Sequence, residues 1–440
     1  MVQFYSSGPR KATQQTIIVT PHELDSLGQG VARHQGKTIF ISGALPTEQV
    51  EAVINENKRN YCKAKTKKIL SPSAQRVIPA CAHFGVCGGC NQQHASSTLQ
   101  QENKSRSLGQ LFLRETGFLP QQGSVIYGDS YGYRRRVRLG LQYHVKQKRL
   151  LMGFRQRASN DLVEITQCPI MFNPLEQLLV PLRHCLASLS IVKKLGHAEL
   201  VQADNGPMLV LRHLVSLSDS DRQALLEFAQ RYQLSVYLAG ESDRLEVLAL
   251  ADDGPYYRIG DLVLGFNPRD FIQINADVNQ LMIAQALEWL DIQPSDRVLD
   301  LFCGMGNFTL PIAQRAREVI GVEGVESLVA TGQKNALDNG LSNVKFLHHN
   351  LEQDVSCQPW AGQGFNKILL DPARAGAAEA MPQIIKLQPE RIVYVSCNPQ
   401  TLVNDAKVLL SKGYALTQLR MLDMFPQTGH IESMALFIKK

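Results

Sequence analysis

The stretch that decides the fold is RVLDLFCGMGN, residues 297–307. It begins as an apolar run of strand length and ends as a glycine-rich turn before a further apolar segment from about Phe308. A buried strand that runs through such a turn into a helix is typical of a parallel α/β sheet, and the turn lets a ligand approach the backbone. The motif alone is a weak signal, because the third glycine of a dinucleotide-binding fingerprint and a phosphate-binding lysine are both missing.

Around this stretch, alternating strand and helix patterns predict a Rossmann-like α/β domain over residues 266–440. Four more strand patterns end in polar or reactive residues: 319–322 in Glu323, 344–349 in Asn350, 367–370 in Asp371 and 391–395 shortly before Cys397. Because parallel strands end at one edge of a sheet, we expect Glu323, Asp371 and Cys397 to line one rim with Asp300 and Gly304. The acid after the second strand is placed to bind ribose hydroxyls, and the amide after the third lies where an adenine edge would be.

Cys397 lies in the segment YVSCNP, residues 394–399, where an apolar strand ends in an Asn-Pro turn signal. Free cysteines are usually buried and simply pack, so position alone favours a structural cysteine. The ligand-binding rim predicted around it favours a reactive thiol instead.

Length and composition are typical of an ordinary globular protein of two to four domains, with 440 residues, 44% hydrophobic and 20% charged. The segment Met1–Lys11 lacks the apolar core of a signal peptide, and no apolar run approaches the roughly eighteen residues of a membrane span. We therefore expect a cytoplasmic protein without membrane contact. In such a protein the nine cysteines indicate metal binding, catalysis or packing rather than disulfide bonds.

Positive charge is concentrated in two blocks. Residues 1–75 hold ten Lys/Arg against five Asp/Glu, and residues 131–157 hold nine Lys/Arg and no acid, although the whole chain has a net charge of only +6. Two basic blocks on an otherwise acidic chain are typical of a protein that binds nucleic acid. The alternative is a pair of solvated basic faces without a partner.

The N-terminal block, residues 1–76, predicts a small β-barrel of the OB type. Short strand patterns recur at 16–19, 28–32, 37–41, 49–54 and 61–67. Six of the eleven residues from Lys58 to Lys68 are basic, so the last strand is expected to contact phosphates. The phrases LDSLGQGVAR and GALPTEQVEAVI resemble those of a TRAM domain, an RNA-binding barrel.

A cysteine motif follows, with Cys81, Cys87 and Cys90 in Cys-x₅-Cys-x₂-Cys spacing among glycines. Thiolates suit zinc or iron–sulfur clusters, and a structural zinc site usually pairs two Cys-x-x-Cys knuckles, so the spacing favours a cluster, most simply 4Fe-4S. Cys168, in a Cys-Pro pair, is the best fourth ligand, and His83 and His94 are weaker candidates.

The motif opens a central region, residues 77–265, which we expect to be the iron–sulfur domain. Residues 98–118 predict an amphipathic helix, and the helical stretch to about 128 is a candidate to pack on the C-terminal domain. Residues 131–170 and 197–265 predict a β-rich fold that flanks helical residues 173–192. The expected architecture is thus a multidomain α/β protein: barrel, central iron–sulfur domain and Rossmann-like domain.

Taken together, these features resemble the family of S-adenosylmethionine-dependent RNA uracil-C5 methyltransferases. The matching phrases span the C-terminal domain: DFIQIN (270–275), LDLFCGMGNFTL (299–310), LLDPARAG (369–376), VYVSCNPQTL (393–402) and MLDMFPQTGHIE (421–432). The combination of a TRAM barrel with the cysteine motif is similar to the branch that acts on 23S ribosomal RNA. The resemblance implies S-adenosylmethionine as cofactor and methylation of C5 of one uracil in 23S rRNA, of the uracil(1939) type; we also expect a monomer.

The resemblance also implies roles for individual residues. Cys397 is the expected nucleophile at C6 of the uracil, and Glu432 is the expected general base for the C5 proton. The expected cofactor-binding residues are Gln273, Phe302, Asn307, Glu323, Asn350 and Asp371. Which of Gln273 and Asp371 faces the uracil stays open. Phe271 could stack on a flipped base or be an ordinary core residue, and the barrel and the Arg134–Arg138 cluster are expected to hold phosphates.

Other functions predict different residues. A non-catalytic iron–sulfur RNA-binding protein should lack the nucleophile, the base or the ribose acid, whereas Cys397, Glu432 and Glu323 are all present. A nicotinamide-dependent oxidoreductase should have three glycines in the first turn. Two questions stay open: whether the target is another rRNA site or tRNA, and whether the cluster is structural or redox-sensing.

Overall fold

The structure, a computed structural model, describes residues 15–240, 244–351, 353, 355, 356, 358 and 360–440. Residues 1–14, the first part of the expected barrel with two of its basic residues, lie outside the described residues, as does Cys357. The chain forms two compact units. The first contains the described residues up to Pro79, Asn91–Asn103 and Gln427–Gly429, and the second contains Ala80–Cys90, Lys104–Pro426 and His430–Lys440.

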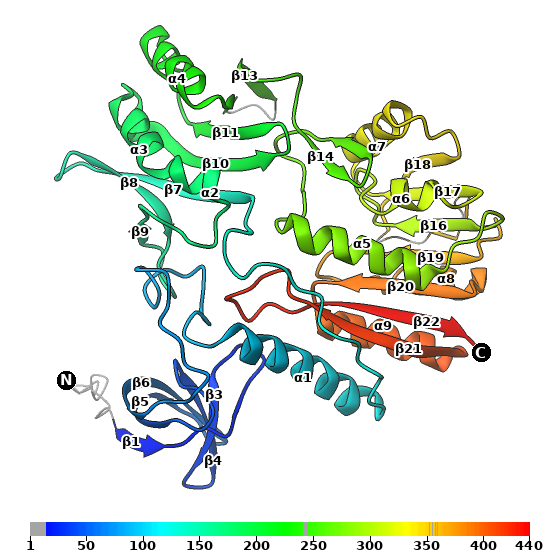
Figure 1. Cartoon of the computed structure of the whole chain (residues 1–440), viewed down its shortest axis with the longest axis horizontal. Coiled ribbons are helices and arrows are strands. Elements are labelled where there is room, and N and C mark those ends of the chain that lie inside the picture. Colours follow the sequence, from blue (N-terminus) through cyan, green and yellow to red (C-terminus); the bar gives the residue numbers. More distant parts are fainter. Residues whose placement is uncertain (1–14, 241–243, 352, 354, 357, 359) are drawn as a thin grey trace, which may run out of the picture. The chain divides into compact units, whose positions relative to one another are not determined.

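The first unit is built on a six-stranded sheet with the order β1-β5-β6-β4-β3-β2 (Figure 1). Its strands are β1 (Thr16–Val19), β2 (Glu23–Leu24), β3 (Gly30–His34), β4 (Lys37–Ser42), β5 (Gln49–Asn57) and β6 (Tyr61–Ser71). All five predicted strands are present, and the short β2 is an addition. In β6 the buried residues Cys62 and Ala64 alternate with exposed lysines, so the predicted basic face of this strand is confirmed.

The second unit contains a seven-stranded sheet with the order β13-β12-β11-β10-β7-β8-β9. Its strands are β7 (Arg136–His144), β8 (Arg149–Arg155), β9 (Leu162–Glu164), β10 (Leu195–Ala203), β11 (Gly206–His213), β12 (Ser235–Ala239) and β13 (Leu245–Ala249). Its helical elements are α2 (Asn173–Gln177), α3 (Leu179–Ser188), η1 (Val192–Lys194) and α4 (Asp219–Tyr232). The helix α4 was not predicted. It begins with a reciprocal capping box between Ser218 and Asp221.

A second seven-stranded sheet of the same unit has the order β18-β17-β16-β19-β20-β22-β21. Its strands are β16 (Arg297–Leu301), β17 (Glu318–Glu323), β18 (Val344–His348), β19 (Lys367–Leu370), β20 (Arg391–Ser396), β21 (Tyr414–Leu422) and β22 (Glu432–Lys439). The five strands from β18 to β20 are parallel, as predicted, and β22 runs antiparallel to both of its neighbours. In chain order, β16, β17 and β18 are added one after another towards one edge of the sheet. The chain then returns to the centre, where β19 lies on the other side of β16. Ligands bind at such a switch point in open α/β sheets.

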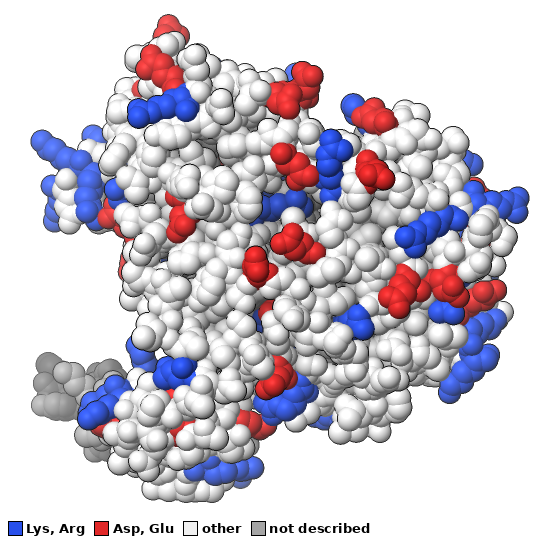
Figure 2. Space-filling model, in the orientation of Figure 1, with Lys and Arg blue, Asp and Glu red and all other residues white. Residues whose placement is uncertain are grey.

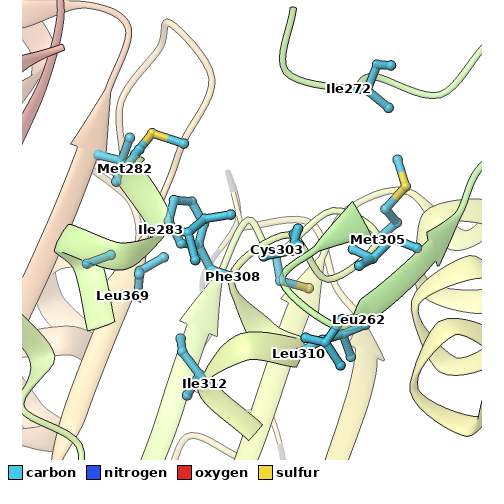
Figure 3. Close-up of a cluster of buried hydrophobic side chains, with 14 of the residues drawn as sticks. Leu262, Ile272, Met282, Ile283, Cys303, Met305, Phe308, Leu310, Ile312 and Leu369 are labelled. Atoms are coloured by element: carbon cyan, nitrogen blue, oxygen red, sulfur yellow. The ribbon is translucent and has the colours of Figure 1, made fainter. Parts of the chain in front are cut away.

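Helices and apolar side chains cover both faces of this sheet. The helices are α1 (Ser97–Thr116), α5 (Ala276–Leu290), α6 (Thr309–Ala313), α7 (Glu326–Asp338), α8 (Met381–Leu387) and α9 (Pro399–Ser411). A separate hairpin of β14 (Tyr256–Ile259) and β15 (Leu262–Gly265) also packs here. One face forms a core with α5, α6 and the hairpin, where Met282, Phe308 and Leu369 meet (Figure 3). The other face packs against α8, α9 and Leu108 and Phe112 of α1. Burial of both faces explains the near-continuous apolar strand sequences.

No helix within the described part of the chain is long and apolar enough to cross a membrane.

Candidate active site

A cavity of about 430 Å³ lies where β16, β19 and β20 end, within the volume range of ordinary small-molecule sites. Seven of the eight catalytic and cofactor-binding residues predicted from the sequence line it: Gln273, Phe302, Asn307, Glu323, Asp371, Cys397 and Glu432. Asn350 is exposed and does not line the cavity, although its backbone lies beside Gly324 at the same edge. Asp300 lies behind the cavity, fully buried, and accepts a hydrogen bond from the Thr309 hydroxyl at 2.6 Å.

The turn after β16 gives the cavity its floor. Phe302 has a φ of 63°, in the left-handed region that bulky residues rarely adopt, and such a conformation costs about 1–3 kcal/mol. Gly306, with a φ of 107°, leaves room that a Cβ would fill at 3.0 Å from Leu310 and 3.2 Å from Phe346. The Glu323 carboxylate fixes the turn by accepting a hydrogen bond from the Gly304 amide at 3.0 Å. Its oxygens keep lone pairs available for a ligand hydroxyl.

Asn307 is held by its neighbours on the wall of the cavity. Its side-chain amide exchanges two hydrogen bonds of 3.0 Å with the amide of Asn279, and its Oδ1 also accepts one from the Tyr257 hydroxyl at 3.2 Å. Asn307 therefore presents a fixed face to the cavity. Tyr257 comes from the β14–β15 hairpin, and nothing in its local sequence singled it out.

Cys397 and Glu432 are brought together by strand register. In the antiparallel pair β20–β22, Ser396 lies opposite Ser433, so the residue after β20 and the first residue of β22 are neighbours. Both line the cavity, and Glu432 is only 8% exposed. A thiol and a carboxyl 35 positions apart in the sequence thus face one small space.

Burial raises the pKa values of the acidic side chains that line this cavity. It raises the pKa of Glu432 to about 8, to which nearby Asp371 also contributes while Lys104 acts in the opposite direction. Burial raises the pKa of Asp371 to about 7. The pKa of the Cys397 thiol is raised by burial and then by Glu432 and Asp371, while Arg374 lowers it. A cationic ligand in the cavity would favour the charged form of each carboxyl.

Arg374 was missed as a site residue, although it stands in the quoted DPAR motif three positions after Asp371. It lines the cavity and is the cation that stabilises the Cys397 thiolate. Phe271 also lines the cavity with 68% of its surface exposed, so the interpretation of this residue as core packing is wrong.

The prediction of phosphate contacts by the Arg134–Arg138 cluster is wrong for its two central members. Arg135 is 5% exposed, donates from Nε to the carbonyl of Gln273 at 2.8 Å and stacks on Tyr257. Arg136 pairs with Glu199 at 2.8 Å and donates to the carbonyls of Asp270 and Pro268. The two arginines therefore hold the segment that carries Phe271 and Gln273, and they are not available to RNA.

The four predicted ligand cysteines gather at one place in the second unit. Burial, with the thiols of Cys90, Cys81 and Cys87, raises the pKa of Cys168 to about 12, so Cys168 lies within electrostatic reach of the other three cysteines. The loop of Cys87 is tied to β8 by a hydrogen bond from the Gly88 amide to the Arg155 carbonyl at 2.9 Å. Among the residues that the structure describes, no three His, Cys, Asp or Glu side chains are placed to hold a single metal ion. Four thiols near one another are nevertheless the donor set of a cluster of several irons.

Comparison with known proteins gives consistent names. The tRNA (Uracil-5-)-methyltransferase family matches residues 96–440. The chain is 61% identical over 440 residues to the 23S rRNA (uracil(1939)-C(5))-methyltransferase RlmD of Yersinia enterocolitica, covering 100% of this chain and 99% of that protein. It is 58% identical over 443 residues to the protein of the same name from Pectobacterium atrosepticum, covering 100% of this chain and 98% of the relative.

A solved structure with a similar fold is the Pyrococcus abyssi tRNA (uracil-54, C5)-methyltransferase in complex with S-adenosyl-L-homocysteine. The TM-score is 0.72 at 21% identity, with 96% of this chain and 100% of that chain covered, which shows a shared fold. With a family match over three quarters of its length and full-length relatives above 55% identity, the chain belongs to the family of RNA uracil-C5 methyltransferases.

Proposed function

We propose that this enzyme transfers a methyl group from S-adenosylmethionine to C5 of one uracil in 23S ribosomal RNA, of the uracil(1939) type named for its relatives. The observation that carries the proposal is the pairing of Cys397 and Glu432 on neighbouring strands in a cavity that also holds Phe302, Glu323 and Asp371. Mass spectrometry of RNA from cells without the gene tests it. One 5-methyluridine should disappear from 23S rRNA and none from tRNA; loss from tRNA alone would contradict the proposed substrate.

The cavity fits the cofactor by its size and by its donor set. S-adenosylmethionine, when bound, supplies an electrophilic methyl group beside its positively charged sulfur. Glu323 at the end of β17 is placed for the ribose hydroxyls, as in other nucleotide-binding α/β sheets. Phe302 and Asn307 offer an apolar face and a fixed amide. Asn350 lies outside the cavity lining, beside Gly324 at the same sheet edge, and in this proposal it approaches the adenine from there. Gln273 and Asp371 also line the cavity, and in this proposal they lie between the cofactor and the base.

The chain supplies covalent catalysis. C5 of uracil is a poor nucleophile, whereas C6 is electrophilic because it is conjugated to the C4 carbonyl. The Cys397 thiolate adds to C6, so that C5 gains enolate character and can accept the methyl group. The Glu432 carboxylate then removes the proton from C5, the C5–C6 double bond re-forms, and the bond from sulfur to C6 breaks. Arg374 favours the thiolate before addition and after elimination.

Phe271 completes the base pocket in this proposal. Uracil in folded RNA must leave its stack before C5 and C6 become reachable, and an aromatic ring can replace the lost stacking. The exposed ring of Phe271 at the cavity mouth is available for that contact, and Arg135 and Arg136 hold its segment in place.

We propose that Cys81, Cys87, Cys90 and Cys168 hold an iron–sulfur cluster, most simply 4Fe-4S. Methyl transfer from a sulfonium moves no net electrons, so a cluster here would cross-link the loop before α1 to the loop between β9 and α2. Protein isolated without oxygen should be brown, with broad absorption near the blue. Cys168→Ser should lose colour and iron together, whereas Cys185→Ser, outside the group, should keep both. A colourless, zinc-bearing wild type would contradict the cluster.

The exposed part of the central basic block remains a candidate for RNA contact. Lys146 and Lys148 lie at the end of the β7–β8 hairpin, and Lys193 stacks on Tyr143 of the same sheet beside Lys194. All four lysines are exposed, and none pairs with an acid among the described residues. Figure 2 shows Lys and Arg side chains gathered over the end of this hairpin. We call this group the hairpin lysines, and propose that it binds RNA phosphates.

Replacing all four hairpin lysines with alanine should weaken RNA binding without changing the chemical step. Each phosphate contact contributes about 0.7–0.9 to the slope of log affinity against log salt, so the slope should fall by about 3. A matched control replaces four exposed lysines elsewhere on the same unit, Lys334, Lys345, Lys386 and Lys412, with the same loss of charge. Equal salt slopes for the two variants, measured by fluorescence anisotropy, would contradict a specific contact.

The proposal also assigns a role to each domain expected from the sequence. The first unit would act as a TRAM-type RNA-binding barrel over residues 1–76, with the exposed lysines of β6 on phosphates. Residues 77–265 would form the iron–sulfur domain, and residues 266–440 the methyltransferase domain. We propose that the protein works as a monomer in the cytoplasm, where its RNA substrate is found.

A further inference from the structure

Helix α1 carries a lysine with a completely buried side chain. Lys104 is 0% exposed, and its ammonium group donates to Asp423 Oδ1 at 2.8 Å and to the carbonyl oxygen of Phe425 at 3.0 Å. Asp423 directly follows β21, and the connection from β21 ends at Glu432, the first residue of β22. One cation thus fixes two points of the segment that leads into the proposed general base.

A gain in stability is a weak explanation for a buried ion pair such as this one. Two charges removed from water lose hydration that their attraction rarely repays, and apolar replacements of buried ion pairs are often neutral or stabilising. The described residues contain a comparable buried pair, Lys367 with Asp296 at 2.5 Å, at the amino end of β19 and therefore at the sheet edge opposite the cavity. The Lys104 pair differs in having Glu432 within its electrostatic reach.

The charges around Glu432 explain what the lysine contributes. Burial and Asp371 both raise the pKa of Glu432, and Lys104 lowers it. Cys397 faces the same carboxyl and is affected by its charge. His430 lies near the ammonium as well, and burial, Arg374, Lys104 and Arg134 all lower the pKa of this imidazole, so they disfavour a second positive charge there. Lys104 is therefore the cation that favours the carboxylate form of Glu432.

We propose that Lys104, held by Asp423, is a positioning residue for Glu432: it fixes the strand connection that carries the base and favours the carboxylate that removes the C5 proton. The inference rests on the proposed function. In that step the carboxylate takes the proton, the C–H electron pair forms the C5–C6 double bond, and the Cys397 sulfur leaves C6 as thiolate. Without the ammonium, Glu432 remains neutral to a higher pH, so elimination slows while addition and methyl transfer continue.

The double variant Lys104→Met/Asp423→Asn separates this role from a structural one, because it removes both charges and leaves no unpaired ion. The substrate is a 23S rRNA transcript with tritium at C5 of uracil, and the readout is tritium release in a single turnover. We expect release at pH 7.5 to slow by about tenfold, with recovery towards pH 9 and with accumulation of the RNA–protein adduct before elimination. The midpoint of the pH profile of release should move upward by about one unit, which corresponds to that tenfold change.

Asp423→Asn alone is the second variant: it removes the carboxylate that raises the pKa of the buried Lys104 amine, so it disfavours the ammonium and should move the midpoint upward, in the same direction as the double variant. The matched control Lys367→Met/Asp296→Asn removes the buried pair at the opposite sheet edge and should leave the profile unchanged. Thermal unfolding identifies which variants are folded. A wild-type profile in either folded variant of the Lys104 pair would overturn the inference. Absence of tritium release from the wild-type enzyme would instead overturn the proposed function.

Discussion

Replacing Cys397 with alanine should abolish uracil methylation while S-adenosylmethionine still binds. Alanine removes the sulfur that adds to C6, and without this addition C5 does not become nucleophilic enough to accept a methyl group. The loss should exceed about 10⁴-fold in single-turnover rate, as removal of a catalytic nucleophile does in other covalent enzymes. Calorimetry should give nearly unchanged affinity for the cofactor, because the turn that contains Phe302 and the Glu323 carboxylate are untouched.

The matched control for this variant is Cys185→Ala, which removes a partly buried thiol of α3, a helix outside the cavity. It should methylate RNA at the wild-type rate. Methylation by the Cys397 variant at a rate near that of the wild type would exclude covalent catalysis by this residue. Loss of cofactor binding in the same variant would point to a damaged cavity rather than a missing nucleophile.

Much of the catalytic domain could be predicted from the sequence, because parallel strands that are buried on both faces appear as short, nearly continuous apolar runs. The run Lys367–Leu370 is a strand with the predicted bounds; Glu323 is the last residue of its strand, and Asp371 and Cys397 directly follow theirs. Their convergence follows from topology alone, since the carboxyl ends of parallel strands share one edge. That is why seven of the eight predicted catalytic and cofactor-binding residues line one cavity.

Long-range polar partners could not be predicted in the same way. The arginine run looked like a phosphate-binding surface, but Arg135 and Arg136 use their donors on backbone carbonyls more than 130 positions away. The sequence alone does not reveal whether a charged side chain will face solvent or form hydrogen bonds inside the fold. Lys104 shows the same limit, because its partner Asp423 is 319 positions away, and although Asp423 stands in the phrase MLDMFPQTGHIE, nothing in the sequence pairs it with Lys104. The α4 helix was missed because strong strand patterns flank it on both sides.

Replacing Glu432 with glutamine should trap the reaction after methyl transfer. Glutamine keeps the shape of the side chain but cannot take the C5 proton, so the bond from the Cys397 sulfur to C6 should persist as an RNA–protein adduct that survives denaturing gels. In the wild type, the carboxyl with a pKa of about 8 is mostly neutral at pH 6.5 and mostly ionised above pH 8. Because the ionised form is the base, tritium release from C5 should rise with pH, reach half of its maximum near pH 8 and level off above about pH 9.

The glutamine variant should lose this dependence and release tritium at least about 10²-fold more slowly, the lower range for general-base catalysis. Addition should remain, with a pH dependence governed by the Cys397 thiol, whose pKa is raised by burial, Glu432 and Asp371 and lowered by Arg374. Glu390→Gln is the matched control, since it changes an exposed acid beside the opposite end of β20. Methyl transfer without a stable adduct in the Glu432 variant would remove this residue as the base. An adduct that accumulates and eliminates only as pH rises would place the proton transfer at another group, and Asp371, which faces the same cavity with a pKa of about 7, would be the next residue to replace.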